Sequence, residues 1–326
     1  MHSHPYDALT PDAIIQAVES AGFRSDARLL ALNSYENRVY QVGIEDAAPV
    51  IAKFYRPGRW QREQIEEEHS FSRELADAEI SVIAPMANDD GCTLHEFEGF
   101  LFALFPRRGG YPPELDNLDN LLVLGRTIGR IHRVGAASTF HHRPAMHPQH
   151  MLVENRDFLL EHFIPAYLRE AYATLTQDLI DRILPLWRGV GSADLIRTHG
   201  DCHVGNILWR DNCAHFVDLD DCCMAPALQD LWMMLSGERH ERQLQLAEIV
   251  AGYDEFGDFD PRQLRWLETL RTLRIVGYAA WLGRRWHDPA FPHSFPWFNT
   301  ERYWGTHVLE LREQLGALDE PPLQLL

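Results

Sequence analysis

The chain has 326 residues, of which 45% are hydrophobic and 24% charged, a balance typical of a globular protein with room for two lobes. Its formal net charge of −18 argues against nucleic-acid binding, which depends on neutralising phosphates with Lys and Arg. No apolar stretch reaches the roughly 20 residues that a membrane span needs, and the N-terminus lacks the layout of a signal peptide. We therefore expect a cytoplasmic protein that binds neither nucleic acid nor membrane.

The first hundred residues predict a small lobe built on an antiparallel sheet. Short β-rich runs alternate with turn residues, and amphipathic patterns at two places predict helices. The expected helices cover residues 11–22 and 60–76, and the expected strands cover residues 29–32, 39–42, 50–55, 82–86 and 99–106.

The character of the sequence changes after the Gly-rich segment that ends at residue 110. Helical patterns then dominate, at residues 118–134, 158–175, 177–188, 229–236, 241–256 and 261–285. We expect an α+β, bilobal fold with an N-terminal lobe of residues 1–106, a mainly helical C-terminal lobe of residues 107–326, and a hinge at about 104–110.

One polar segment interrupts the helical half. In "THGDCHVGNILWRDNCAHFVDLDD", residues 198–221, two short apolar runs read as the strands of a hairpin whose turn is "RDN". Such a hairpin brings the loop before its first strand beside the residue after its second strand. Asp201, Asn206 and Asp218 would then meet at one end.

These residue types suit phosphoryl transfer. Carboxylate and amide oxygens are ligands for Mg²⁺, which phosphate oxygens and waters complete, and a further Asp can accept a hydroxyl proton. His199 is expected to support the loop. Two other interpretations compete: Asp and Asn often only form turns, and the His–Asp–His alternation of "HGDCH" would also suit a metallohydrolase.

The N-terminal lobe offers a partner for nucleotide phosphates. Lys53 lies on an expected strand, "VIAKFYR", and a strand lysine that contacts phosphates is usually oriented by a helix Glu. Glu68 lies next to the apolar stripe of the 60–76 helix and is the favoured partner, with Glu67 second. The competing interpretation of Lys53 is a solvated surface lysine.

The remaining nucleotide contacts are expected in less patterned segments. The chain has neither of the Gly-rich phosphate motifs, so residues 33–38, "NSYENR", would cover the phosphates, with Ser34 and Asn37 as donors. The backbone of residues 103–107, around Phe105, would contact the adenine.

These motifs carry a family resemblance. The runs "HGDCHVGNILW", "FVDLDD" and "ALQDLW" resemble the signature of the aminoglycoside phosphotransferase and choline kinase superfamily, which has a protein-kinase-like fold. Further runs along nearly the whole chain, among them "KFYRPGRW" and "LGRTIGRIHRVG", resemble the bacterial stress response protein kinases of that superfamily.

The resemblance implies a monomeric, cytoplasmic kinase that depends on ATP and Mg²⁺ and phosphorylates Ser and Thr of proteins. It marks Asp201 as proton acceptor, Asn206 and Asp218 as Mg²⁺ ligands, Ser34 as an ATP-loop residue and Lys53 as the phosphate-contacting lysine, with Asp218 also counted as catalytic. The alternative is a small-molecule kinase acting on an aminoglycoside, choline or homoserine.

The sequence also departs from ordinary protein kinases. Gly200 precedes Asp201 where those enzymes carry Arg, and only eight residues separate Asp221 from Asp230. We expect no long activation loop and no switching by ordering one. Asp230 is expected to cap a helix or to brace the catalytic loop. The aromatic segment of residues 281–297 is expected to pack in the core, with lining of a substrate cleft as the alternative.

Overall fold

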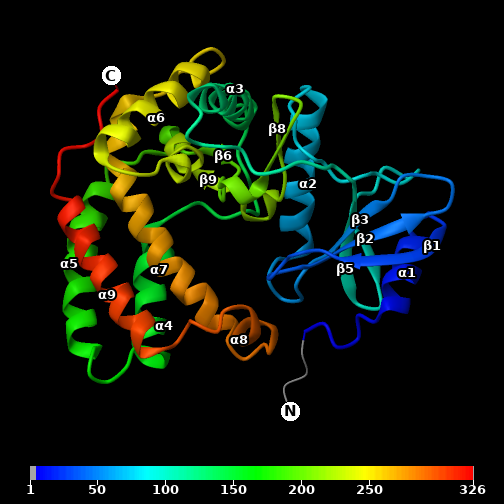
Figure 1. Cartoon of the computed structure of the whole chain (residues 1–326), viewed down its shortest axis with the longest axis horizontal. Helices are drawn as coiled ribbons and strands as arrows, with labels where there is room; N and C mark the ends of the chain where they lie inside the picture. The colour runs from blue at the N-terminus through cyan, green and yellow to red at the C-terminus, as the bar shows by residue number, and fades with distance from the viewer. Residues whose placement is uncertain (1–4, 326) are drawn as a thin grey trace.

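A five-stranded antiparallel sheet forms the N-terminal lobe of the computed structural model, which describes residues 5–325 (Figure 1). The strand order is β1-β2-β3-β5-β4. The strands are β1 (Ser25–Ala31), β2 (Arg38–Ile44), β3 (Val50–Phe54), β4 (His95–Phe97) and β5 (Phe100–Pro106).

Helix α1 (Pro11–Ser20) packs its apolar stripe on this sheet. Thr10 caps its first turn by accepting from Ala13 N, and Pro11 occupies the first helical position, where its missing N–H costs nothing. Ile14 and Val18 are buried in one cluster with residues of β2, β3 and β5. The expected helix and meander are thereby confirmed.

Helix α2 (Arg62–Asp77) stands between the two lobes (Figure 1). Its first half buries Ile65 against the sheet, in a small cluster with Tyr55 and Ala103. Its second half buries Phe71 and Leu75 in the large core of the helical lobe. One helix therefore belongs to both cores. The lobe boundary at residues 106 and 107 stays a prediction.

Helices make up most of the C-terminal lobe (Figure 1). The largest crossing joins α3 and α6, where glycines on both helices let the backbones approach closely. The helices are α3 (Leu118–Gly135), α4 (Asn155–His162), α5 (Arg169–Trp187), α6 (Arg239–Tyr253), α7 (Leu267–Arg285), α8 (Ala290–Ser294) and α9 (Glu301–Ala317).

Two small strand pairs lie among these helices. The predicted hairpin is confirmed: β7 (Ile207–Arg210) pairs with β8 (Cys213–Phe216). Its turn residues, Asp211 and Asn212, both have the left-handed backbone conformation that suits a two-residue hairpin turn, with φ of 54° and 55°. A second pair, β6 (Ile196–Thr198) with β9 (Cys223–Ala225), flanks the hairpin and was not predicted.

Three expected elements were wrong. The helix expected over 158–175 breaks after His162, because Pro165 cannot continue it, and α5 runs on through residues 177–187. Residues 229–236 form short 3-10 turns. Residues 82–86 form no strand: Val82 makes a single bridge to Phe216, and Pro85 has no N–H to donate.

The bilobal α+β architecture is confirmed. Among residues 5–325, no helix is both long enough and apolar enough to span a bilayer.

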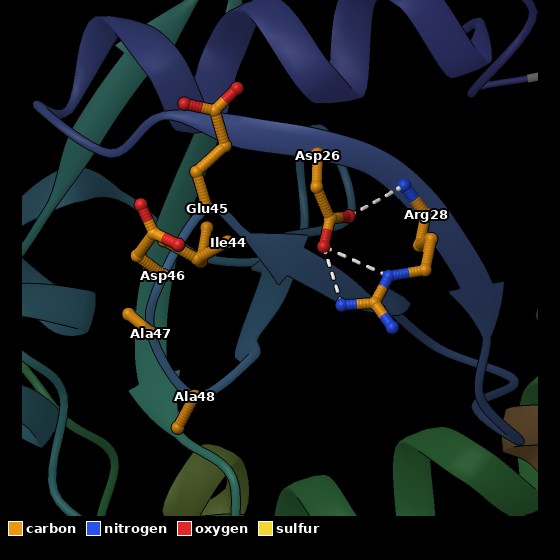
Figure 2. Close-up of a pocket in the computed structure, with 7 residues that line it drawn as sticks. All are labelled: Asp26, Arg28, Ile44, Glu45, Asp46, Ala47 and Ala48. Atoms are coloured by element: carbon orange, nitrogen blue, oxygen red, sulfur yellow. Dashed lines mark hydrogen bonds and ion pairs between the residues drawn. The ribbon is translucent and has the colours of Figure 1, made fainter.

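A shallow hollow lies at the outer end of the β1–β2 pair (Figure 2). There Asp26 accepts from the backbone N and Nε of Arg28, at 3.0 and 2.8 Å. A Cβ at Gly43 would lie 2.1 Å from an Asp26 carboxylate oxygen, so the Asp26 side chain would have to shift if another residue replaced this glycine. The hollow is lined by Asp26, Arg28 and Ile44–Ala48, and none of these residues lines the cavity between the lobes.

Candidate active site

A cavity of about 1190 Å³ lies between the two lobes. Its wall comes from the β1–β2 loop and strands β3 and β5 on one side, and from the segment around β7 and β8 and helix α7 on the other. All the predicted site residues line it: Ser34, Asn37, Lys53, Glu68, Phe105, Asp201, Asn206 and Asp218. The fold therefore brings together residues that lie up to 184 positions apart, from Ser34 to Asp218.

The loop that carries Asp201 is held by side chains from the 3-10 turn that follows β9. Asp230 accepts from the backbone N of His199 at 2.7 Å and of Gly200 at 2.9 Å. Gln229 Nε2 donates to the carbonyl of Gly200 at 2.7 Å. Asp230 is itself held by His132 at 2.9 Å. Of its two expected roles, Asp230 therefore has the second, bracing the catalytic loop.

Gly200 explains the departure from the Arg of ordinary protein kinases. Its φ is +84°, a conformation that side chains disfavour, and a Cβ there would lie 2.1 Å from the carbonyl oxygen of Asp221. His199 Nε2 donates to the carbonyl of Val217 at 2.9 Å, as expected of a supporting histidine. The loop before β7 is thus fastened directly to the residues after β8.

Asp201 lies between two basic side chains on the C-terminal side of the cavity. Its Oδ1 accepts from Arg274 Nη1 of α7, and His203 Nε2 lies 3.4 Å from its Oδ2. Burial would raise the pKa of Asp201, but the hydrogen bond from His203 and the charge of Arg274 outweigh it and hold the pKa well below its usual range. Asp201 is therefore ionised.

Lys53 faces three carboxylates. Its Nζ lies 2.8 Å from Asp218 Oδ1, 3.3 Å from Asp220 Oδ1 and 3.8 Å from Glu68 Oε1. Burial would lower the pKa of Lys53, but the charges of these three groups outweigh it and raise the pKa well above its usual value. Lys53 is a buried, charged lysine and not a solvated one.

Glu67 and Glu68 have different partners. Glu68 is buried beside Lys53, and its burial raises its pKa to about 7 despite the charge of Lys53. Glu67 instead accepts from the backbone N–H groups of residues 141–143, with the bonds from His142 and Arg143 at 2.8 and 2.7 Å. The favoured partner of Lys53 is the one that the structure places next to it.

Asp220, which the sequence indicated only as a support for the metal ligands, is a central acidic group of the cavity. Its side chain is buried and pairs with Lys53 of the sheet and with Arg59 Nη1 of the loop before α2. Burial would raise the pKa of Asp220, but Lys53, Arg59 and Arg143 keep it well below its usual range. Arg59, the second Arg of "KFYRPGRW", is visible in the sequence, but no neighbouring residue indicated that its partner is Asp220, 161 residues away.

Asn37 lines the cavity as expected, but its side chain is bonded within the protein. Its Nδ2 donates to Asp220 Oδ2 at 3.1 Å, and its Oδ1 accepts from the backbone N of Arg56 at 3.1 Å. The side chain is buried and bonded within the protein on both polar atoms, so it supports the cavity wall. Ser34 and the half-buried Phe105 line the cavity as expected.

The residues present fit a magnesium ion. Asn206 Nδ2 donates to the carbonyl of Asp201 at 3.0 Å, which leaves Oδ1 as the amide's acceptor atom, and the Asp218 carboxylate is half exposed. Within residues 5–325 no three His, Cys, Asp or Glu side chains are grouped to hold a metal alone. This donor set matches Mg²⁺, which takes few protein ligands and binds phosphate oxygens as well.

Comparison with known proteins identifies the family. A model of the phosphotransferase enzyme family matches residues 28–267, nearly three quarters of the chain.

The chain belongs to this family.

Relatives of this phosphotransferase extend the match over nearly the whole chain. It is 46% identical to stress response kinase A of Escherichia coli K12, over 98% of this chain and 97% of that protein. It is 43% identical, with the same coverage, to the serine/threonine protein kinase RdoA of Salmonella typhimurium. The resemblance to stress response kinases is thereby confirmed, and family and relatives together support a kinase.

Solved structures share the fold. An amicoumacin kinase in complex with AMP-PNP, Ca²⁺ and Ami superposes with a TM-score of 0.74 at 19% identity, covering 99% of this chain and 98% of that one. At this identity the likeness shows the fold alone.

Proposed function

We propose that this phosphotransferase is an ATP- and Mg²⁺-dependent protein kinase that acts on Ser and Thr, as a monomer in the cytoplasm. The observation that carries the proposal is the convergence of Lys53, Asp201, Asn206 and Asp218 on one cavity. The relative named as a serine/threonine protein kinase, at 43% identity over nearly the whole chain, supports the substrate class.

The chemistry follows from the positions of these groups. The acceptor hydroxyl oxygen attacks the γ-phosphorus in line, the bond to the β–γ bridging oxygen breaks, and ADP leaves. Asp201, held ionised by His203 and Arg274, accepts the hydroxyl proton. Lys53, held charged among carboxylates, contacts the nucleotide phosphates. Asn206 and Asp218 would hold Mg²⁺ together with ATP, and the ion would supply positive charge against the phosphates.

A small-molecule kinase is the second candidate. The amicoumacin kinase, whose structure covers 99% of this chain, is named for amicoumacin and not for a protein. The same catalytic set would serve either acceptor, because the protein mainly positions phosphates and a hydroxyl. The difference lies in what binds along the C-terminal wall of the cavity.

Transfer of labelled γ-phosphate tests the proposal. The protein is incubated with Mg-ATP alone, with a generic protein substrate, and with a panel of amines, sugars and aminoglycosides. We expect label on Ser and Thr of protein. Label on small molecules and never on protein would favour the second candidate.

Asp201→Asn and Asp218→Asn test the assigned roles. Asp201→Asn should lower the transfer rate by about 10²- to 10⁴-fold, the usual effect of losing an acid–base group, while the affinity for ATP stays. Asp218→Asn should weaken the Mg²⁺-dependent part of ATP binding. Asp211→Asn, in the hairpin turn of the same segment, is the matched control and should behave as wild type. Full activity of Asp201→Asn would refute the base assignment.

A further inference from the structure

Glu36 lies on the β1–β2 loop of the N-terminal lobe, 3.8 Å from Arg56 Nε and 4.0 Å from Arg59 Nε of its own lobe, yet the two hydrogen bonds to its carboxylate come from the other lobe. Trp281 Nε1 donates to Oε2 of Glu36 at 2.6 Å, and Arg285 Nη2 donates to Oε1 at 2.9 Å. Both partners belong to the last turns of α7. The carboxylate is largely buried, with 11% of its side chain exposed.

Two neighbouring contacts cross between the lobes at the same place. The ring of Tyr35, the residue before Glu36, packs on Phe295 with the ring centroids 4.7 Å apart. Arg56, at the end of β3, donates from Nη2 to Asp288 Oδ2 at 3.0 Å, and both side chains are buried. The loop is thus fastened to the segment formed by the end of α7 and α8, which lies nearest the sheet in Figure 1.

One face of α7 connects this attachment to the catalytic loop. Arg274, Tyr278, Trp281 and Arg285 are spaced by four, three and four residues, the spacing that puts side chains on one side of a helix. The first of them reaches Asp201, and the last two reach Glu36. A single helix face therefore touches both the proposed base and the loop expected to cover the phosphates.

Stability alone does not account for this arrangement. A buried ion pair loses about as much in desolvation as it gains in attraction, so apolar residues would hold the lobes together as well. Directional bonds from an indole and a guanidinium instead fix where the loop lies. Ser34, two residues before Glu36, lines the cavity on this loop.

We propose that Glu36 is a positioning residue, which ties the loop of residues 33–37 to α7 and so holds Ser34 and the loop's backbone N–H groups over the nucleotide phosphates. This inference rests on the proposed function. The inference adds to the proposed function that nucleotide binding depends on α7, the helix that also reaches Asp201.

The test separates KM from kcat in purified full-length protein. Glu36→Ala removes both hydrogen bonds and should raise KM for Mg-ATP about tenfold or more, since bonds to a charged group are worth more than neutral ones. Glu36→Gln keeps the shape and an acceptor oxygen and should show a smaller rise. Trp281→Phe removes only the indole donor and should raise KM severalfold. Glu45→Ala, an exposed partner of Arg24 in the same lobe, is the matched control with unchanged KM.

A merely structural role predicts a different result. Partial unfolding would lower the active fraction and hence kcat, with KM unchanged. Wild-type KM in both Glu36→Ala and Trp281→Phe, with phosphate transfer intact in wild type, would overturn the inference and leave the proposed function standing.

If the wild-type protein transfers no phosphate, KM cannot be measured, and equilibrium binding of Mg-AMP-PNP then tests the positioning role of Glu36. The proposed function would then have failed. Weaker binding by Glu36→Ala and Trp281→Phe than by Glu45→Ala would still support the positioning role, and equal binding would overturn it.

Discussion

Lys53 shows how a single side chain keeps its charge while buried. A lysine at this depth would lose its proton without compensating charges, and Asp218, Asp220 and Glu68 supply them within 4 Å. The group that we propose to contact phosphates is therefore charged before any nucleotide binds. Its three partners come from two segments, helix α2 and residues 218–220, and they tie both segments to the sheet that carries Lys53.

The two neighbouring glutamates should respond differently to substitution. Glu67→Gln keeps the size but loses the charge that accepts three backbone N–H groups of residues 141–143, and we expect about 1–3 kcal/mol lower stability with KM for ATP unchanged. Glu68→Gln should instead raise KM for ATP, because Lys53 loses one of its carboxylates. Urea unfolding and steady-state kinetics on both variants check this. Reversed effects would contradict the pairing of Lys53 with Glu68.

The predictable site residues were those whose own sequence context marked them. Asp201, Asn206 and Asp218 are close in sequence, so a two-residue hairpin turn was enough to bring them together. Lys53 was marked by its place on a strand together with the motif at residues 198–221, since the strand alone left a solvated lysine as an equal alternative. Arg59 and Arg274 could not be assigned, because each meets a carboxylate more than 70 residues away and only the packing of the lobes decides which one.

Helices α3 and α6 cross so closely that glycine is required on both. A Cβ at Gly125 would lie 2.0 Å from the carbonyl of Ile249, and one at Gly252 would lie 2.1 Å from that of Leu122. This crossing also positions His132, which holds Asp230 and through it the catalytic loop.

Gly125→Ala should therefore destabilise the protein by about 1–3 kcal/mol, the usual cost of overpacking a core. Gly305→Ala is the matched control, because nothing lies within 4 Å of a Cβ there, on the exposed side of α9. It should be neutral or more stable by about 0.5–1 kcal/mol, since alanine favours a helix. Thermal unfolding of both variants measures the difference. Equal melting temperatures for Gly125→Ala and Gly305→Ala would contradict the close crossing.

Elements were predictable where local pattern and tertiary packing agree. The 3.6-residue pattern of α3 and the short apolar runs of β3 and β5 were sufficient. The segment 229–236 has a helical pattern, but the side chains of Gln229 and Asp230 bond to the catalytic loop and the backbone forms short 3-10 turns around them. Pro165 was a visible break in the expected helix over 158–175.

The two lobes share helix α2, so they should not unfold separately. Phe71 and Leu75 are fully buried in the core of the helical lobe, whereas Ile65 is fully buried against the sheet. We expect a single unfolding transition in the intact protein, with far-UV circular dichroism and tryptophan fluorescence coincident.

Residues 1–106 alone test this point directly. They would expose Phe71 and Leu75 to water, and we expect them to lack a cooperative transition. Two separate transitions in the whole chain, or a stably folded fragment, would contradict it.

The shared helix also bears on how such an enzyme is controlled. An ordinary protein kinase can be turned off by swinging the helix that orients its phosphate lysine, but here that movement would pull Phe71 and Leu75 out of a packed core. With so short a segment between Asp221 and Asp230, phosphorylation has no loop to order either. We expect an enzyme that is active once folded, so that its output in the cell follows synthesis, degradation and the exposure of its substrates.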